Sequence, residues 1–154
     1  MAKRIVMFLV DERRFGFPIE IVDRIVQIVE VTPLPNLPRM AIGIINLQGK
    51  IIPVLNIRPC FEMPERQLNL LDQLIIVTQD QKSVAYLVDQ VIDVIEYSEK
   101  DFIDLELIFP GIEYVKQVLK RQDELILLLH NLDKLLPMDK AKPLQESITH
   151  ANRK

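Results

Sequence analysis

The chain has little of several residue types that small proteins use for stability or chemistry. Its 154 residues include one cysteine, no tryptophan, four glycines and 6% aromatic residues. A single cysteine, Cys60, excludes an internal disulfide framework and is typical of a reducing compartment. Its neighbours Pro59 and Phe61 favour a buried thiol that acts as a small hydrophobe over a nucleophile. So few glycines leave no phosphate-binding loop, and neither a GxGxxG nor a Walker pattern is present.

Charge and hydropathy exclude two further classes of protein. The net charge is −3 and lysines and arginines form no block, so we expect no nucleic-acid binding. The first apolar run, Ile5–Val10, ends at Asp11. It is too short for the core of a signal peptide or for a membrane span. We therefore expect a cytoplasmic protein without direct membrane insertion.

Side chains that could carry catalysis or bind a metal are also few. His130 and His150 are the only histidines, and the first ends an apolar run where a hydrogen-bonded histidine is favoured over a general base. Asp101, Asp104 and Glu106 lie close together but lack the glycine and the spacing of a calcium loop. A solvated acidic face is favoured over a cation site. The sequence thus predicts no enzyme, no cofactor and no metal.

Valine, isoleucine and leucine dominate the 49% of residues that are hydrophobic, which favours strands. The run 43-GIINLQGKIIPVLNIR-58 predicts a hairpin in which Gly49 supplies the positive φ of a tight turn. The proline-rich stretch 33–38 predicts an extended connector. Segment 21–31 is open between strand and short helix, and 114–119 suits a helix. From residue 137 the chain becomes a polar tail that is either mobile or a surface helix.

Three pairs of segments indicate an internal duplication. Residues 22-VDRIVQIVE-30 align with 88-VDQVIDVIE-96 at a shift of 66, and 4-RIVMFLV-10 resembles 73-QLIIVTQ-79. The apolar run 51–55 matches 126–130 at a shift of 75. Matches that keep the same order along the chain are what a duplicated supersecondary unit leaves. The sequence therefore predicts two similar small β units that share a core, and barrels rather than a βαβ sheet.

Apolar side chains at matching places in the two repeats suggest a contact surface. Val22, Ile25, Val91 and Val94 alternate with polar residues on strands that polar turns leave near a sheet edge. Burial in the core and exposure in a groove are both consistent with this pattern. A groove lined by such residues would accept the apolar stripe of a helix.

The order of the motifs resembles the CheW-like domain of bacterial chemotaxis adaptors. The typical pattern of that family is a P..P connector, G-V-x-N-L-R-G, an apolar strand, D-L-R, and later V-D-x-V-x-x-V. The resemblance extends from about residue 4 to residue 136, and each motif alone is weak. This chain matches the pattern at Pro35, Pro38, Gly43, Asn46, Leu47, Gly49, Pro53, Ile57, Arg58, Val88, Asp89, Val91 and Val94.

The resemblance implies an all-β fold of two intertwined, small, five-stranded SH3-like β-barrels with short helical segments. Residues 1–136 would form one CheW-like domain made of two duplicated barrel subdomains, followed by a polar tail, 137–154. It also implies a non-enzymatic adaptor that couples the cytoplasmic tip of a chemoreceptor to the regulatory domain of a CheA-type histidine kinase. That kinase domain is itself CheW-like, so contacts with other CheW-like domains are expected as well.

By position, the resemblance assigns residues to two partner-binding surfaces and to two structural turns. The turns would be at Gly43 and Gly49, and the surface facing the kinase would include Phe102 and Ile103. The groove for the receptor would include Val22, Arg24, Gln48, Leu74, Val91 and Val94.

Four departures from the family pattern bear on partner choice. Gln48 replaces the usual Arg of N-L-R-G, and a neutral amide holds a carboxylate less firmly than a guanidinium. Asn56 replaces the usual Asp, Gln117 lies where the second half often has Gly, and segment 101–106 lacks the common prolines. The adaptor could therefore serve a specialised chemosensory array, pilus motility or a biofilm pathway as well as a flagellar one. The alternative function is a ligand-responsive regulatory module that uses the cleft between the barrels.

Overall fold

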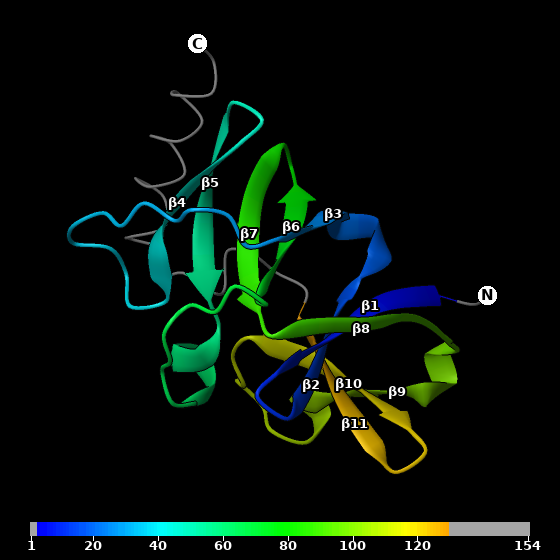
Figure 1. Ribbon diagram of the computed structural model, residues 1–154. Coiled ribbons are helices and arrows are strands. Elements are labelled where there is room, and N and C mark those ends of the chain that lie inside the picture. The colour runs from blue at the N-terminus through cyan, green and yellow to red at the C-terminus, as the bar shows by residue number, and fades with distance from the viewer. Residues whose placement is uncertain (1–2, 130–154) are drawn as a thin grey trace.

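The computed structural model describes residues 3–129, which form two β-sheets joined by short 3-10 turns (Figure 1). The strands of the first half of the chain are β1 (Lys3–Val10), β2 (Arg13–Pro18), β3 (Val22–Gln27), β4 (Ala41–Leu47) and β5 (Lys50–Asn56). Those of the second half are β6 (Gln73–Gln79), β7 (Lys82–Val88), β8 (Gln90–Tyr97), β9 (Phe102–Asp104), β10 (Val115–Arg121) and β11 (Glu124–Leu129). The 3-10 turns are η1 (Ile19–Ile21), η2 (Arg58–Phe61), η3 (Glu99–Asp101) and η4 (Leu105–Leu107).

The two halves of the chain exchange their first hairpins. The six-stranded sheet has the order β8-β1-β2-β11-β10-β9, and the five-stranded sheet has the order β3-β6-β7-β5-β4. Hairpin β1–β2 thus lies among strands of the second half, and hairpin β6–β7 lies among strands of the first half (Figure 1). The pairs β2–β11 and β5–β7 are parallel, and the other pairs are antiparallel. The predicted all-β fold of two intertwined units is confirmed.

Each sheet encloses a small core of its own, and a third core lies between the sheets. All five strands of one sheet contribute to the first cluster, which includes Ile45 and Leu74. Ile5 and Leu128 belong to the corresponding cluster in the other sheet. The largest cluster joins both sheets and is centred on aromatic residues such as Phe8. Strands β1, β5, β6 and β7 are therefore buried on both faces, which explains why their sequences are nearly continuous apolar runs.

The ladders of the two sheets have the same pattern of strand pairing, at registers that differ from two of those in the sequence alignment. Val22 faces Val77 across the β3–β6 ladder, and Val91 faces Phe8 across the β8–β1 ladder. A one-residue bulge follows each of the two valines, so β3 corresponds to β8 at an offset of 69, not 66. Likewise β4–β5 corresponds to β10–β11 at an offset of 74, not 75. Similar apolar residues recur every two or three positions in these strands. A sequence alignment shifted by one or three residues therefore still places apolar residues opposite one another.

The same correspondence explains why one sheet has a sixth strand. In that sheet β9 pairs with β10, and Ile103 lies opposite Val118. At the equivalent place in the other sheet, Thr32 forms an isolated bridge with Ile44. The proline-rich stretch that follows Thr32 cannot continue a hydrogen-bonded ladder, so the five-stranded sheet keeps only this bridge.

The structure also shows the conformation of two segments and two glycines for which the sequence made predictions. Segment 21–31 begins as strand β3, and segment 114–119 forms most of β10 rather than a helix. Gly49 is in the expected turn, but Gly43 lies inside β4 and not in a turn. A Cβ on Gly43 would overlap the carbonyl oxygen of Thr32, so glycine is required there by the close approach of two backbones.

Some expectations concern residues outside the described part of the chain. These are the roles of His130 and His150 and the nature of the tail 137–154. Within residues 3–129, no helix is both long and apolar enough to span a membrane.

Candidate protein-interaction surfaces

Strands β3 and β8 present the apolar residues that the repeat singled out. Each is the outermost strand of its sheet, so one of its edges has no neighbouring strand. Val22 and Val91 are half-buried and pack against the core between the sheets. Ile25 and Val94, three residues further along each strand, are 38% and 43% exposed. Ile92 of β8 is also exposed, at 42%. Each edge strand therefore has an anchored apolar residue at its start and exposed apolar side chains beyond it, an arrangement that suits contact with another protein.

Arg24 and Gln48 form a polar pair where the β4–β5 hairpin meets β3. The Arg24 Nη1 donates a hydrogen bond to the Gln48 Oε1 over 3.0 Å. Gln48 has a φ of 53° and Gly49 a φ of 86°, so both central residues of this two-residue turn are left-handed. The Asn46 Oδ1 accepts a hydrogen bond from the Gly49 N–H at 2.9 Å and holds the turn. A guanidinium is thus present beside the position where the family usually has its arginine.

Leu74 does not belong to this surface, contrary to the assignment by position. Its side chain is fully buried and is part of the core inside the five-stranded sheet. Leu74 and Ile76 point to the same side of β6, towards that core. A partner could reach Leu74 only by opening the sheet.

The remaining receptor-groove residues form two groups. Val22, Arg24 and Gln48 come from the five-stranded sheet, whereas Val91 and Val94 come from β8 in the other sheet. A hydrogen bond of 2.7 Å from the Val91 N–H to the Gln73 Oε1 ties the start of β8 to the five-stranded sheet.

A network of ion pairs, which the sequence did not reveal, connects the two sheets. Arg58 is buried, and its guanidinium binds Asp11 at 2.7 Å and Asp89 at 2.9 Å. Arg66 binds both Asp72 and Asp89 at 2.5 Å. These residues come from the β1–β2 turn, from the η2 region and the loop after it, and from the β7–β8 junction. Arg58 and Asp89 match the family pattern in the sequence, but the sequence does not show that they meet, since partners up to 78 residues apart in the chain join in the network.

The electrostatics of Asp89 follow from this network. Burial by itself would raise the pKa of the Asp89 carboxyl, but hydrogen bonds from Arg66, the Asp11 N–H and Arg58 outweigh it. The pKa of Asp89 therefore lies below its ordinary value, and the hydrogen bonds to Asp72 and Asp89 raise the pKa of Arg66. Both groups remain charged at neutral pH.

A second apolar surface surrounds the residues assigned to the kinase. Phe102 is half-buried and meets Tyr97 edge-to-face, with ring centroids 4.1 Å apart. Ile103 is 39% exposed. The sequence did not single out Leu107, the last residue of η4, or Phe109, two residues after it; they are 84% and 63% exposed. We call Ile103, Leu107, Ile108 and Phe109 the β9–η4 strip.

The three clustered carboxylates have local structural roles. Asp101 accepts a hydrogen bond from the Ser98 N–H, and Asp104 accepts one from the Glu106 N–H at 3.0 Å. The Glu106 carboxylate accepts a hydrogen bond from the Gly111 N–H. These contacts hold two 3-10 turns and the loop that follows them.

The chemistry available to the described residues is limited. Burial raises the pKa of the Cys60 thiol to about 11, partly offset by the charge of Arg39, so the thiol is protonated and unreactive at neutral pH. The Cys60 Sγ lies 3.9 Å from the Met40 Sδ, in apolar surroundings. Across residues 3–129, His, Cys, Asp and Glu form no group of three or more that could hold a metal ion.

Comparison with known proteins agrees with this geometry. The chain matches the family model described as CheW-like domain over residues 4–140. It is 29% identical to the chemotaxis protein CheW of Treponema pallidum, covering 82% of this chain and 78% of that protein. It is 24% identical to the chemotaxis protein CheW of Thermotoga maritima, covering 86% of each. The crystal structure of scaffolding protein TtCheW from Thermoanaerobacter tengcongensis superposes with a TM-score of 0.75 at 30% identity, covering 84% of this chain and 89% of that one.

The family model covers nearly all of the described residues, including both exchanged hairpins and the two edge strands. The low identities place the sequence far from each of these relatives. The chain is a divergent member of the CheW-like domain family.

Proposed function

We propose that this protein is a non-enzymatic adaptor that couples chemoreceptors to a CheA-type histidine kinase. Membership of the CheW-like family supports a scaffold role in chemotaxis. Because the tips of such receptors lie in the cytoplasm, we expect the protein to act there. The comparisons do not favour the alternative of a ligand-responsive module.

One observation carries the proposal: a single body of two interlocked sheets exposes two separate apolar surfaces. One consists of the outer edges of β3 and β8, and the other is the β9–η4 strip. A scaffold needs two surfaces that partners can occupy at once, held at a constant relative position. The exchanged hairpins and the Arg58 network supply that rigidity.

We assign the receptor to the first surface. Ile25 and Val94 would pack against the apolar stripe of a receptor helix. Val22 and Val91 hold the two strands in place by packing against the core between the sheets. The Arg24–Gln48 pair lies exposed at the end of this surface, where it can donate to carboxylates or carbonyls of the receptor. Leu74 is left out because it is buried.

We assign the regulatory domain of the kinase to the β9–η4 strip together with Phe102. Leu107 and Phe109 are large, exposed and close in sequence, and apolar side chains in that state mark a contact surface. The edge-to-face contact with the Tyr97 ring holds the Phe102 side chain in place.

Calorimetric titration with the kinase regulatory domain and with a receptor-tip fragment from the same organism tests both assignments. We expect one-to-one binding of each partner, and binding of both at once. Val94→Ala should weaken only receptor binding, and Phe109→Ala only kinase binding, so each variant is the control for the other. If neither partner binds the wild-type protein, the adaptor role is wrong. If either variant weakens both partners equally, the two surfaces are not separate.

A further inference from the structure

Three leucines between η2 and β6 form an exposed apolar group that neither adaptor surface includes. Leu70 and Leu71 are 90% and 81% exposed, and Leu68 is 50% exposed. We call residues 66–72, which contain all three, the leucine loop. Large apolar side chains exposed this close together mark a contact site for another protein.

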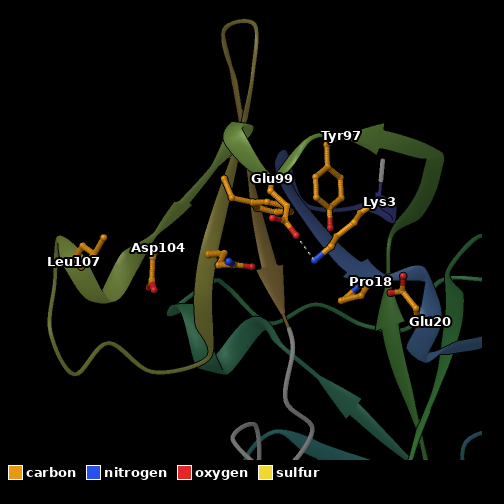
Figure 2. A pocket seen from close by; sticks show the side chains of 9 residues that line it. Lys3, Pro18, Glu20, Tyr97, Glu99, Asp104 and Leu107 are labelled. Carbon is orange, nitrogen blue, oxygen red and sulfur yellow. Dashed lines mark ion pairs between the residues drawn. The ribbon is translucent and has the colours of Figure 1, made fainter. Parts of the chain in front are cut away.

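The leucine loop is distinct from the surface assigned to the kinase. Leu107, which is exposed to a similar degree, lines a cavity of about 600 Å³ together with Phe102 (Figure 2). Both residues are already assigned to the kinase, so this cavity belongs to that surface. The leucine loop contributes no residue to it.

Hydrogen bonds within the leucine loop fix its shape. The Arg66 guanidinium closes the loop by binding both carboxylate oxygens of Asp72, at 3.0 and 2.5 Å. The Asp72 carboxylate also accepts a hydrogen bond from the Asn69 N–H at 2.9 Å. The Leu71 N–H donates to the Asn69 Oδ1 at 2.8 Å. Because the backbone is held before any partner arrives, the leucines can bind at a low cost in conformational entropy.

The loop lies between the two strands that carry the proposed receptor surface. The Ile28 N–H donates a hydrogen bond to the Asp72 carbonyl oxygen at 3.1 Å. This bond continues the β3–β6 ladder one residue beyond the pair Gln27 and Gln73. On the other side, Arg66 binds Asp89, the residue just before β8. The leucine loop is therefore continuous with the receptor surface.

The distance along β3 shows how a partner could use both sites. Ile25, the exposed residue of β3, lies three residues before Ile28, which is bonded to the end of the loop. A strand rises about 3.3 Å per residue, so the loop begins about 10 Å beyond Ile25. The axes of two packed helices are about 8–10 Å apart. A helix that packs on Ile25 thus leaves room for a neighbouring helix over the leucine loop.

We propose that the leucine loop packs against a second helix of the receptor, beside the helix that lies on β3 and β8. Leu70 and Leu71 insert between side chains of that second helix, as knobs do in the holes of a coiled coil. The inference rests on the proposed function and deepens it. The receptor must present two adjacent helices with apolar residues, and the loop selects receptors whose second helix accepts the leucines.

Calorimetric titration of the receptor-tip fragment into full-length variants tests the contact. The double variant Leu70→Ser with Leu71→Ser should weaken receptor binding about tenfold and leave binding of the kinase regulatory domain unchanged. Leu125→Ser changes a leucine of β11 that is 59% exposed, so it is the matched control and should bind both partners as wild type does. Asn69→Ala keeps the leucines but frees the loop, and should weaken binding less, through a less favourable entropy.

Each other result has a definite meaning. If the double variant binds the receptor as tightly as Leu125→Ser does, the inference is wrong, whereas weakening by Val94→Ala alone would still support the adaptor assignment. If the double variant loses kinase binding instead, or if only the wild type sediments as a dimer, the loop is covered by the kinase or by a second copy. If the wild type binds no receptor fragment, the proposed function is wrong and this inference fails with it.

Disulfide crosslinking tests the arrangement of two helices. Ile25→Cys and Leu70→Cys are each combined with single cysteines placed along the receptor fragment and oxidised. The two variants should crosslink to different helices of the fragment. The native Cys60 should not interfere, because its pKa of about 11 keeps the thiol protonated. Crosslinks from both variants to the same helix would overturn the proposal.

Discussion

At the scale of single residues, similar aliphatic side chains in strands of the two different sheets have opposite roles. Val94 is 43% exposed on the edge strand β8 of the six-stranded sheet. Leu74 is fully buried on β6, an inner strand of the five-stranded sheet. Both stand in apolar runs of the sequence, and both match positions of the family groove. The place of the strand separates the core residue from the contact residue, because β6 is an inner strand buried on both faces and β8 is an edge strand.

This contrast leads to the first prediction. Val94→Ala should weaken receptor binding by about 1–2 kcal/mol and leave thermal stability nearly unchanged, because the side chain is largely exposed. Leu74→Ala should instead lower the free energy of unfolding by about 2–5 kcal/mol, because it leaves a cavity in a packed core. Calorimetric binding and urea denaturation of both variants measure the two effects. A loss of stability in Val94→Ala as large as its loss of binding would assign Val94 to the core.

The Arg24–Gln48 pair leads to the second prediction, which changes what the sequence alone suggested. An arginine at position 48 would restore the family's charged fork, but it would lie beside the Arg24 guanidinium and remove the acceptor that Arg24 uses. Gln48→Arg alone should therefore gain little affinity for the receptor tip. Arg24→Gln should weaken receptor binding by about 1.5–3 kcal/mol, as expected for one charge-assisted hydrogen bond.

The charge-swapped double variant, Arg24→Gln with Gln48→Arg, should recover most of that loss, because the guanidinium returns to the same place from the hairpin. Titration of the receptor-tip fragment into all three variants checks the order. A double variant that binds no better than Arg24→Gln would show that the guanidinium must come from β3.

At the scale of elements, the β4–β5 hairpin depends on two glycines for different reasons. Gly49 needs only its left-handed φ of 86°, and no neighbouring atom lies near its missing side chain. Gly43 lies against the Thr32 carbonyl, at the point where the proline-rich connector crosses the edge of the sheet. The connector and the hairpin therefore constrain each other.

The third prediction concerns these glycines. Gly49→Ala should destabilise the protein by about 1–2 kcal/mol, the cost of a left-handed residue with a Cβ. Gly43→Ala should cost about 1–3 kcal/mol more than that, because the Cβ also displaces the backbone at Thr32. Urea denaturation of the two variants compares them directly. Equal losses would show that the connector moves aside without cost.

At the scale of the whole molecule, the two sheets are held by the exchange of hairpins and by the Arg58 network. Arg58 is 3% exposed and is satisfied by Asp11 and Asp89 together. Removing one of the two carboxylates would destabilise the protein, because the remaining carboxylate cannot supply all the hydrogen bonds that the buried guanidinium needs.

The fourth prediction is a pH dependence that follows from Asp89. The pKa of Asp89 is lowered in the folded protein, so its contribution to stability is complete above the ordinary pKa of an aspartate and is lost as pH falls through the lowered value. Asp89→Asn should therefore destabilise the protein by about 2–3 kcal/mol at neutral pH. The difference from wild type should shrink once the pH falls below about 4. Thermal unfolding from pH 7 to pH 3 measures it, with Asp93→Asn, an exposed aspartate on β8, as the control. If the difference in stability between Asp89→Asn and wild type did not vary with pH, ionisation of Asp89 would not stabilise the fold.

Several features could be predicted from the residues because they depend on local pattern. The apolar runs at 4–10, 51–55 and 73–79 indicated buried strands, and their recurrence in order indicated a duplication. Gly49 indicated the hairpin turn, and the proline-rich stretch indicated the connector. The registers of the repeats differ from the sequence alignment by three residues and by one, because similar apolar residues recur every two or three positions and only strand pairing fixes the register.

Composition and local pattern were enough to predict the class of fold, a repeat along the chain and, through the order of its motifs, the family. Each of these depends on composition and on patterns of a few neighbouring residues. The tertiary structure alone decided that the hairpins are exchanged, that Leu74 is buried while Val94 is exposed, and that Arg58 meets Asp11 and Asp89. These facts depend on which strands pair across the chain, and pairing between distant segments leaves no mark on the residues of either one.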